Sequence, residues 1–453
     1  MTAQSERASS GLRVQAPLAF QQEWALNHWM QKGFPFVAFF SAYLRGPFDA
    51  NVFQKSVSML IERHQSLRIG FVEISGLLTQ VACGQVDCKV TFEKITACEH
   101  SSVEVQAKDL LQRFSSEQMD ISVPPLMEIR VFELGVREQL LAVKVHHLVT
   151  DGVSQMLFFR ELWSLYGDLI KGKGHSLHNV PLQYLDYAAQ QRIQHPEWLM
   201  EHRGYWEKKL SNASPVRAPV ETGLRTGKSG RSASQEIELD QALSLKLFGL
   251  ARQERTTPAM LMLALYSVVI RLWCDQIDFV VPFAVSGRWR SEQTRTMGYF
   301  AHYLPLRITV DDKESLAELL RRVVAEFSHA QGHLDAGRIT NDDPSLFQGT
   351  SLNWVPAELI LSTPQEWSGR SDCPTIEPFP LDDHPHENFK LPCETHCVLI
   401  NTREGIRGAM YYRADLLKSA NVERFCEAMR ALSENVGQRN LAPLSSIYKE
   451  MGW

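Results

Sequence analysis

Apolar residues occupy every second position in the stretch that leads to residue 147, and their spacing becomes helical a few positions later. One face of the predicted strand carries Leu141, Val143, Val145 and His147, and the other carries Leu140, Ala142, Lys144 and His146. Beyond Gly152 the apolar residues at helical spacing are Val153, Leu157, Leu162, Leu165 and Leu169. This change of period predicts a strand, a tight turn and a helix.

The same reasoning predicts helices and strands along most of the chain. Five helices are predicted: one begins near Pro17, one covers residues 52–61, one starts at Gln241, one follows Thr257-Pro258 and one covers Asn421–Val436. The predicted strands are Leu126–Leu134, Gln139–His147, Ile277–Ala284, Thr350–Pro356, Thr395–Asn401 and Ile406–Tyr412. The short gap between the first two strands predicts a hairpin. Thr257 before Pro258 predicts a helix N-cap with proline in the first helical position.

This order of elements predicts two α/β units of similar size. At 453 residues the chain is longer than one hydrophobic core usually supports. The segment Ser211–Ser234 is rich in Ser, Gly, Pro and Arg and has no apolar period, which indicates a linker or mobile loop. We therefore expect a flexible lead over residues 1–15, a first lobe over 16–180, connecting helices and a linker over 181–235, and a second lobe over 236–453.

Composition narrows the class of protein. A net charge of -5 gives no case for nucleic-acid binding, which needs a concentrated basic surface. The longest apolar run, Pro258–Ile270, is too short to span a bilayer and predicts a buried helix. The polar N-terminus lacks a secretory signal, and eight cysteines in a chain of this length do not make a disulfide framework. We expect a cytoplasmic protein.

The predicted turn carries a base and a carboxylate. The run His146–Gly152 is H-H-L-V-T-D-G, so two histidines, an aspartate and a glycine lie within seven residues of the junction. Regular structure on both sides of such a turn can hold a catalytic side chain in place. Neighbouring strand residues point to opposite faces, so the two histidines do not converge on one ion. We expect a metal-free site.

Six short segments in order give the chain a family resemblance. They are Pro17–Trp24 (compare S-x-A-Q-x-R-x-W), Arg63–Arg68 (R-H-E-x-L-R), His146–Gly152 (H-H-x-x-x-D-G), Tyr184–Ala188 (Y-x-D-Y-A), Met297–Phe300 (I-G-x-F) and Tyr412–Leu417 (Y-x-x-D-L-F). Over residues 16–450 the chain resembles a condensation domain of nonribosomal peptide synthesis, in the chloramphenicol-acetyltransferase-like acyltransferase superfamily. The family's H-Q-D-x-P-F-E element is not recognisable at Gln331–Ile339. Val153 stands at the position after D-G, where the family often has an aromatic residue. We expect these departures to affect substrate preference more than the class of reaction.

The resemblance implies a fold and an activity. The fold would be α/β, an α+β sandwich of two chloramphenicol-acetyltransferase-like lobes in a V-shaped pseudo-dimer with a central tunnel. The activity would be transfer of an acyl chain from a carrier-protein phosphopantetheine thioester to an amine or alcohol, forming an amide or ester. No adenylation or carrier-protein motif accompanies it in this sequence, so we expect a free-standing, monomeric enzyme that receives its donor from a separate carrier protein and has no cofactor of its own.

The resemblance also assigns roles to residues at the turn. His147 takes the place of the base or positioning group for the nucleophile; a histidine merely satisfied in the core is the alternative. His146, on the opposite strand face, is expected to support the fold. Asp151 is expected to pair with Arg288 of the second lobe, because a buried carboxylate needs a partner; a solvated aspartate at a turn is the alternative.

Two further residues have two interpretations each. Gly152 is expected to serve the tight turn, and its N–H could also face the developing oxyanion. Asn353 resembles an asparagine that lines the acceptor side of the family's channel, but a polar strand residue satisfied by the backbone fits equally well.

Three other functions are alternatives to carrier-dependent condensation. A coenzyme A-dependent O- or N-acyltransferase of the same superfamily would turn over soluble acyl-CoA. A non-catalytic docking module usually has a damaged H-H-x-x-x-D-G, whereas the motif is intact here. Epimerisation is disfavoured, because Glu404–Gly408 has isoleucine at the position where the corresponding element needs histidine.

Overall fold

The computed structural model describes residues 14–28, 30, 36–95, 102–174, 177–193, 196–220, 232–333, 344–357, 371–379, 391, 393–439 and 441–450. Most of the predicted lead (residues 1–13) and the middle of the predicted linker (221–231) lie outside these residues. So does the segment 334–343, which contains most of the H-Q-D-x-P-F-E position.

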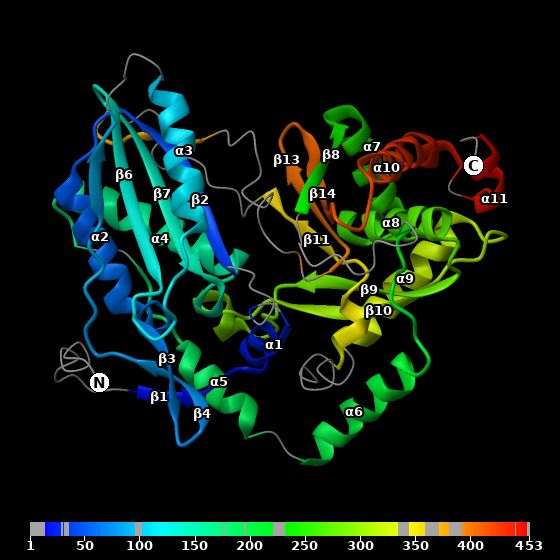
Figure 1. The fold of residues 1–453 in the computed structure, drawn as a ribbon, viewed down its shortest axis with the longest axis horizontal. Coiled ribbons are helices and arrows are strands. Elements are labelled where there is room, and N and C mark those ends of the chain that lie inside the picture. The colour runs from blue at the N-terminus through cyan, green and yellow to red at the C-terminus, as the bar shows by residue number, and fades with distance from the viewer. Residues whose placement is uncertain are drawn as a thin grey trace.

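The first lobe is a five-stranded sheet with helices on both faces (Figure 1). Its strands, in spatial order, are β12 (Thr375–Pro378), β2 (Val37–Arg45), β7 (Glu138–His146), β6 (Met127–Gly135) and β5 (Thr91–Lys94). The helices are α2 (Ala50–Arg63) and α4 (Gly152–Ile170) on one face and α3 (Val103–Ser116) on the other. A smaller sheet beside it has the order β1 (Val14–Pro17), β4 (Leu77–Ala82), β3 (Ile69–Ile74). The predicted hairpin is confirmed, since β6 and β7 pair antiparallel across a two-residue turn.

The prediction for the N-terminus is wrong in part. Val14 and Gln15, expected in the flexible lead, belong to β1 and pair with β4. Helix α1 (Phe20–His28) consequently starts three residues after Pro17. The extended segment satisfies its backbone groups on the edge of β4, and that tertiary contact is not contained in the local pattern.

The second lobe is a six-stranded mixed sheet. Its strands, in spatial order, are β10 (His302–Thr309), β9 (Asp278–Val285), β11 (Leu352–Val355), β13 (Thr395–Thr402), β14 (Gly405–Arg413) and β8 (Ser232–Asp240). The lobe's helices are α7 (Gln241–Gln253), α8 (Pro258–Cys274), α9 (Leu316–Gln331), α10 (Ser419–Arg439) and α11 (Leu444–Glu450). Helices α8 and α10 lie on the side of the sheet away from the first lobe (Figure 1).

Helix α8 is the centre of this core. The apolar run predicted to form a buried helix does so, and every residue from Met260 to Ile270 is buried. Thr257 is its N-cap, as predicted, with a side chain that accepts from the Met260 N–H. A helix that is apolar on all sides is stable in water only when protein surrounds it, and here the sheet and neighbouring helices do so.

The two lobes are connected by the chain itself and also by segments that pack in the opposite lobe. Helices α5 (Tyr184–Arg192) and α6 (Pro196–Leu210) join them. Strand β12, from the second half of the chain, completes the first lobe's sheet by pairing with β2. The side chains of Met297, Tyr299 and Phe300 lie in the first lobe's hydrophobic core. The lobes are therefore interlocked at the level of single strands and side chains.

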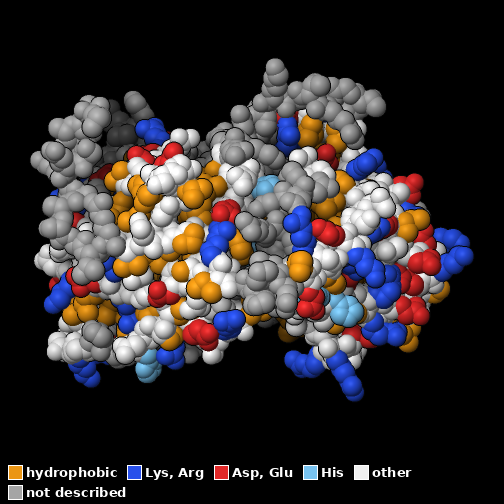
Figure 2. All heavy atoms as spheres, turned by 90° about the horizontal axis from the view of Figure 1, so that it is seen from below, with side chains coloured by type: hydrophobic (Ala, Val, Ile, Leu, Met, Phe, Trp, Pro, Cys, Tyr) orange, Lys and Arg blue, Asp and Glu red, His pale blue; other side chains and the backbone are white. Residues whose placement is uncertain are grey.

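The face of the molecule in Figure 2 mixes positive, negative and apolar side chains. Among the described residues on that face, basic side chains do not form the broad surface that nucleic-acid binding requires. Among the described helices none alone is long and apolar enough to cross a membrane; α7 and α8 meet that test only as a pair, and they are bent by 103°.

Candidate active site

The H-H-x-x-x-D-G run forms the predicted junction between a strand and a helix. Strand β7 ends at His146, a single 3-10 turn, η3 (His147–Val149), follows, and α4 begins at Gly152. Asp151 is the N-cap of α4, and its Oδ1 accepts from the Ser154 N–H at 2.8 Å. The side chain that caps the helix thereby fixes where the turn ends.

His147 is held by one main-chain hydrogen bond and by one contact of its ring with a carbonyl. Its main-chain N–H donates to the Phe36 carbonyl at 2.8 Å, and the ring atom Nδ1 lies 3.4 Å from the Thr150 carbonyl. A carbonyl only accepts, so this contact favours the proton on Nδ1 and leaves the Nε2 lone pair as the basic site. The Phe36 ring packs against the imidazole with centroids 5.0 Å apart, and the Tyr299 ring lies at 6.5 Å.

Burial sets the charge of this imidazole. Desolvation lowers the pKa of His147 below its ordinary value, and the Thr150 carbonyl and Asp151 only partly oppose that effect. The ring is therefore neutral at pH 7. Counted over the whole residue, His147 is half-buried, whereas its neighbours on either side are buried. A neutral and oriented imidazole is suited to accept a proton.

His146 differs from His147 in each of these respects. Its side chain is buried, and its Nδ1 accepts from the Leu148 N–H at 3.2 Å, which caps the 3-10 turn. Burial lowers the pKa of His146 to about 3, so this ring also stays neutral. It acts on the shape of the turn and through it on His147.

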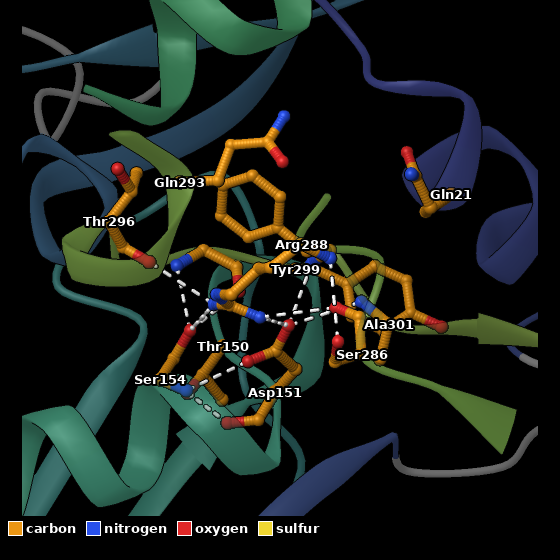
Figure 3. Close-up of polar contacts among 12 residues, drawn as sticks. Gln21, Thr150, Asp151, Ser154, Ser286, Arg288, Gln293, Thr296, Tyr299 and Ala301 are labelled. Atoms are coloured by element: carbon orange, nitrogen blue, oxygen red, sulfur yellow. Dashed lines mark hydrogen bonds and ion pairs between the residues drawn. The ribbon is translucent and has the colours of Figure 1, made fainter. Parts of the chain in front are cut away.

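Asp151 forms an ion pair with Arg288, as predicted. The Asp151 Oδ2 accepts from Arg288 Nη1 at 2.7 Å and from the N–H groups of Phe300 and Ala301 at 2.9 and 3.1 Å (Figure 3). Both side chains are almost completely buried, at 2% and 3% exposed. Oδ1 is used by the Ser154 N–H, so the carboxylate receives four hydrogen bonds. The alternative of a solvated aspartate at a turn is therefore wrong.

Arg288 reaches this carboxylate from the second lobe and has further partners (Figure 3). Its Nη2 donates to the Ser154 hydroxyl at 2.8 Å and to the Thr296 carbonyl at 3.1 Å. Its guanidinium lies over the Phe300 ring, 4.2 Å from the centroid. The ion pair thus joins the N-terminus of α4 to the segment after β9, and neither charge is left unpaired.

The sequence did not single out Ser154 or Gln22. The Ser154 hydroxyl donates to the Gly298 carbonyl and accepts from the Gly298 N–H and Arg288. Its position three residues after the N-cap is the one feature of the sequence that could have indicated a role for Ser154 at the helix start. Gln22, fully buried on α1, donates to the Leu148 carbonyl at 2.8 Å and so anchors the 3-10 turn from the other side. No local pattern reports a contact between residues 22 and 148.

Gly152 and Asn353 lie on different lobes, at the start of α4 and on β11. Gly152 is the first residue of α4 and directly follows the turn, as expected, and it is not among the glycines with a positive φ. As a first-turn residue its N–H has no acceptor within the helix. Asn353 is half-buried on β11 and pairs with Val398, on the sheet face opposite the Leu352 side chain, which lies in the core. Its substrate-binding role stays a prediction.

Gly287 offers a direct test of how tightly Arg288 is placed. Its φ is 67°, and an added Cβ would lie 2.0 Å from the Phe300 carbonyl oxygen. Gly287→Ala is expected to lower the free energy of unfolding by more than about 3 kcal/mol, because the strain of a left-handed alanine, about 1–3 kcal/mol, adds to this clash. Gly76→Ala is the matched control, since φ is 77° there with nothing within 4 Å. Urea unfolding measures both variants, and an equal loss of unfolding free energy in Gly287→Ala and Gly76→Ala would contradict the clash.

Metal ligands are not gathered at this site. Within the described ranges, no group of three or more His, Cys, Asp or Glu side chains is placed to hold a metal ion. The residues that the site does bring together are a neutral imidazole, a helix N-terminus and a buried ion pair from two lobes. That set can accept a proton and stabilise a nearby negative charge.

Fold and site together define a two-lobed α/β protein whose histidine-bearing turn is braced from the other lobe. The family model for the condensation domain matches residues 13–448, so this chain belongs to the condensation-domain family.

Curated relatives of this chain are much longer proteins. The chain is 26% identical over 443 residues to a component of the linear gramicidin synthase of Brevibacillus parabrevis, a match that covers 95% of this chain and 6% of that relative's length. It is 25% identical over 438 residues to the phosphinothricin tripeptide synthetase PhsB of Streptomyces viridochromogenes, covering 95% of this chain and 37% of the relative. The chain therefore spans well under half the length of either relative.

Solved structures share the fold. The condensation domain of the monacolin K polyketide synthase MokA superimposes with a TM-score of 0.80 at 20% identity, covering 96% of this chain and all of that one. The SgcC5 protein of Streptomyces globisporus gives a TM-score of 0.78 at 19% identity, covering 94% of this chain and 100% of its own. The two-lobed chloramphenicol-acetyltransferase-like architecture expected from the sequence is thereby confirmed.

Proposed function

We propose that this protein is an acyltransferase that joins an acyl chain, carried as a phosphopantetheine thioester on a separate carrier protein, to an amine or alcohol acceptor. The product would be an amide or ester in nonribosomal peptide or hybrid polyketide biosynthesis. The proposal includes a monomeric, cytoplasmic enzyme with no cofactor of its own. The observation that carries it is the neutral, oriented His147 at an intact H-H-x-x-x-D-G turn in a condensation domain.

The proposed reaction uses this chain's residues as follows. Nε2 of His147 accepts the proton of the attacking amine or hydroxyl as the C–N or C–O bond forms. The C–S bond then breaks, and the leaving thiolate takes the proton from the imidazolium. The N–H of Gly152, at the positive end of the α4 dipole, faces the oxyanion of the tetrahedral intermediate. The pair of Asp151 and Arg288 holds the turn without contacting substrate.

The test is a transfer assay that follows the mass of the carrier protein. The purified protein is incubated with an acylated carrier and a panel of free amines and alcohols, and the intact mass of the carrier reports loss of the acyl group. Acceptor-dependent loss, with the matching amide or ester in solution, supports the proposal. Turnover of acyl-CoA in the absence of carrier identifies the coenzyme A-dependent enzyme instead, and no turnover of either donor indicates a docking module.

The pH profile of this reaction follows from the pKa of His147. The base acts in its neutral form, and burial lowers its pKa, so protonation sets in only below the ordinary imidazole value of about 6.5. With an alcohol acceptor, which does not titrate in this range, kcat/KM is expected to stay level as the pH falls from about 8 to about 6.5 and to decline only at lower pH. A midpoint above about 7 in single-turnover measurements would contradict a neutral buried base.

A further inference from the structure

Two histidines from different elements are in contact where the connection between the lobes meets the second lobe. His202 lies on α6, and His333 directly follows the C-cap of α9, with its main-chain N–H bonded to the Ala330 carbonyl at 3.1 Å. Their Nδ1 atoms are 2.6 Å apart, and their rings lie at 77° with centroids 4.7 Å apart. His202 is only 7% exposed, and His333 is half-buried. The contact of this histidine pair is therefore direct and largely shielded from water.

The distance between the two nitrogens limits the number of protons that the histidine pair can hold. A ring nitrogen of histidine donates or accepts according to whether it carries a proton. At 2.6 Å one Nδ1 has to donate and the other has to accept, so the contact needs one proton between the two nitrogens. This condition is met when both rings are neutral and when one ring is charged. When both rings are charged, two donors and two positive charges face each other, and the rings have to separate.

The surroundings of the histidine pair leave the imidazoles as the groups that respond to pH. The Tyr205 ring stacks on His333 with centroids 3.8 Å apart, and burial raises the pKa of Tyr205 to about 12, so its hydroxyl stays neutral. Lys209 of α6 and Glu326 of α9 form an ion pair with each other. Other ionisable side chains of α6, α9 and β10 in this region are exposed or paired among themselves: Glu201, Lys208, His329, Arg203 with Glu207, and Arg307 with Asp278. Histidine is the side chain whose charge ordinarily changes between about pH 8 and 5.

The histidine pair lies at one end of the contacts that hold α6 to the second lobe. Trp206, one helical turn after His202, is in that lobe's core and donates from Nε1 to the His333 carbonyl at 3.0 Å. Further along α6, Arg307 donates to the Lys209 carbonyl at 3.2 Å. His202 precedes both contacts, on the side of α6 that leads back to α5 and the first lobe (Figure 1). Loss of the histidine contact would free that part of α6 while the part from Trp206 onward stays bound.

We propose that His202 and His333 form a pH-sensitive contact, which holds the N-terminal half of α6 on the second lobe at neutral pH and opens when both rings are protonated. Protons favour the open form, so the closed fraction falls as the pH is lowered from about 8 to about 5. Opening lengthens the free connection between the lobes and thereby increases their freedom to move. No substrate takes part, so the switch operates whether or not the protein transfers acyl groups.

Hydrogen–deuterium exchange of the substrate-free protein measures this opening. Exchange rates, corrected for the intrinsic effect of pH, are followed from about pH 8 to about pH 5 in peptides that cover residues 200–206 of α6. We expect protection there to fall at least about ten-fold over this range. Peptides from Met260–Ile270 of α8 should keep their protection, because those residues are buried in the lobe's core. Unchanged protection in α6, or an equal fall in α8, would overturn the proposal.

His202→Asn should abolish the pH dependence and keep the contact closed. The carboxamide offers both a donor and an acceptor near the former position of Nδ1, so it can bond His333 whether that ring is neutral or charged. His333→Asn should give the same result from the other side of the contact, at a half-buried position that tolerates substitution more readily than the buried position 202.

His329→Asn is the matched control for both variants. It removes an exposed imidazole one turn earlier on α9, so the wild-type pH dependence of exchange in α6 should remain. A pH dependence that persists in His202→Asn and His333→Asn, or that vanishes in His329→Asn, would assign the response to other groups and overturn the proposal. His147→Ala should also keep the wild-type exchange profile, and its loss there would mean that the response originates at the active site.

Discussion

Replacing His147 with alanine is expected to lower acyl transfer by roughly a hundred- to ten-thousand-fold while the fold is retained. The loss follows because no other described group at the turn is placed to accept the proton: His146 is buried and bound to the Leu148 N–H. The residue His147 is half-buried, whereas its neighbours on either side are buried, so thermal unfolding should change little. Single-turnover loss of acyl group from the carrier measures the effect.

The control for this experiment is the adjacent histidine. His146→Asn keeps a side-chain acceptor for the Leu148 N–H and removes the ring, so it should cost stability and much less activity. A His147→Ala protein that transfers acyl groups at the wild-type rate would exclude any chemical role for the ring. A His146→Asn protein with normal stability but no activity would mean that His146 has the catalytic role that we assign to His147.

Asp151→Asn is expected to lower the free energy of unfolding by about 3–5 kcal/mol and to reduce activity with it. The carboxylate oxygen Oδ2 now accepts from Arg288 and from the N–H groups of Phe300 and Ala301. An amide nitrogen in its place would present donors to donors and leave a buried guanidinium without its counter-charge. Urea unfolding monitored by tryptophan fluorescence gives the stability, and the transfer assay gives the activity.

Glu138→Gln is the matched control for that variant. Glu138 lies at the start of β7, the strand that leads to the turn, and also pairs with an arginine, Arg45, but both side chains are well exposed, at 39% and 45%. Its substitution should cost at most about 1 kcal/mol, because solvent screens an exposed pair. If Asp151→Asn were as stable as the wild type yet inactive, Asp151 would act directly in catalysis.

Local patterns predicted the elements that carry the site. Alternation up to His147 and helical spacing after Gly152 placed the turn within one residue of its position, because both periods are properties of neighbouring residues. The α8 helix was equally predictable, since an unbroken apolar run has to be surrounded by protein. The family resemblance supplied Arg288 as the partner of Asp151, and the ion pair confirms it.

Contacts between distant segments were not predictable in this way. Strand β1 forms on the edge of β4, and β12 pairs with β2 although the two strands come from opposite halves of the chain. Gln22 and Ser154 are ordinary polar residues in the sequence, and only their partners, Leu148 and Gly298, give them a role. No local period encodes which edge or carbonyl a distant segment will meet.

By itself, the sequence determined the position of the histidine-bearing turn, the two-lobed α/β class and the family, because these depend on local periodicity and short ordered motifs. Tertiary structure alone decided that His147 is neutral and half-buried and that four hydrogen bonds converge on Asp151. Charge state, burial and hydrogen bonding depend on which atoms surround a group. Those atoms come from both lobes, and only folding brings them together.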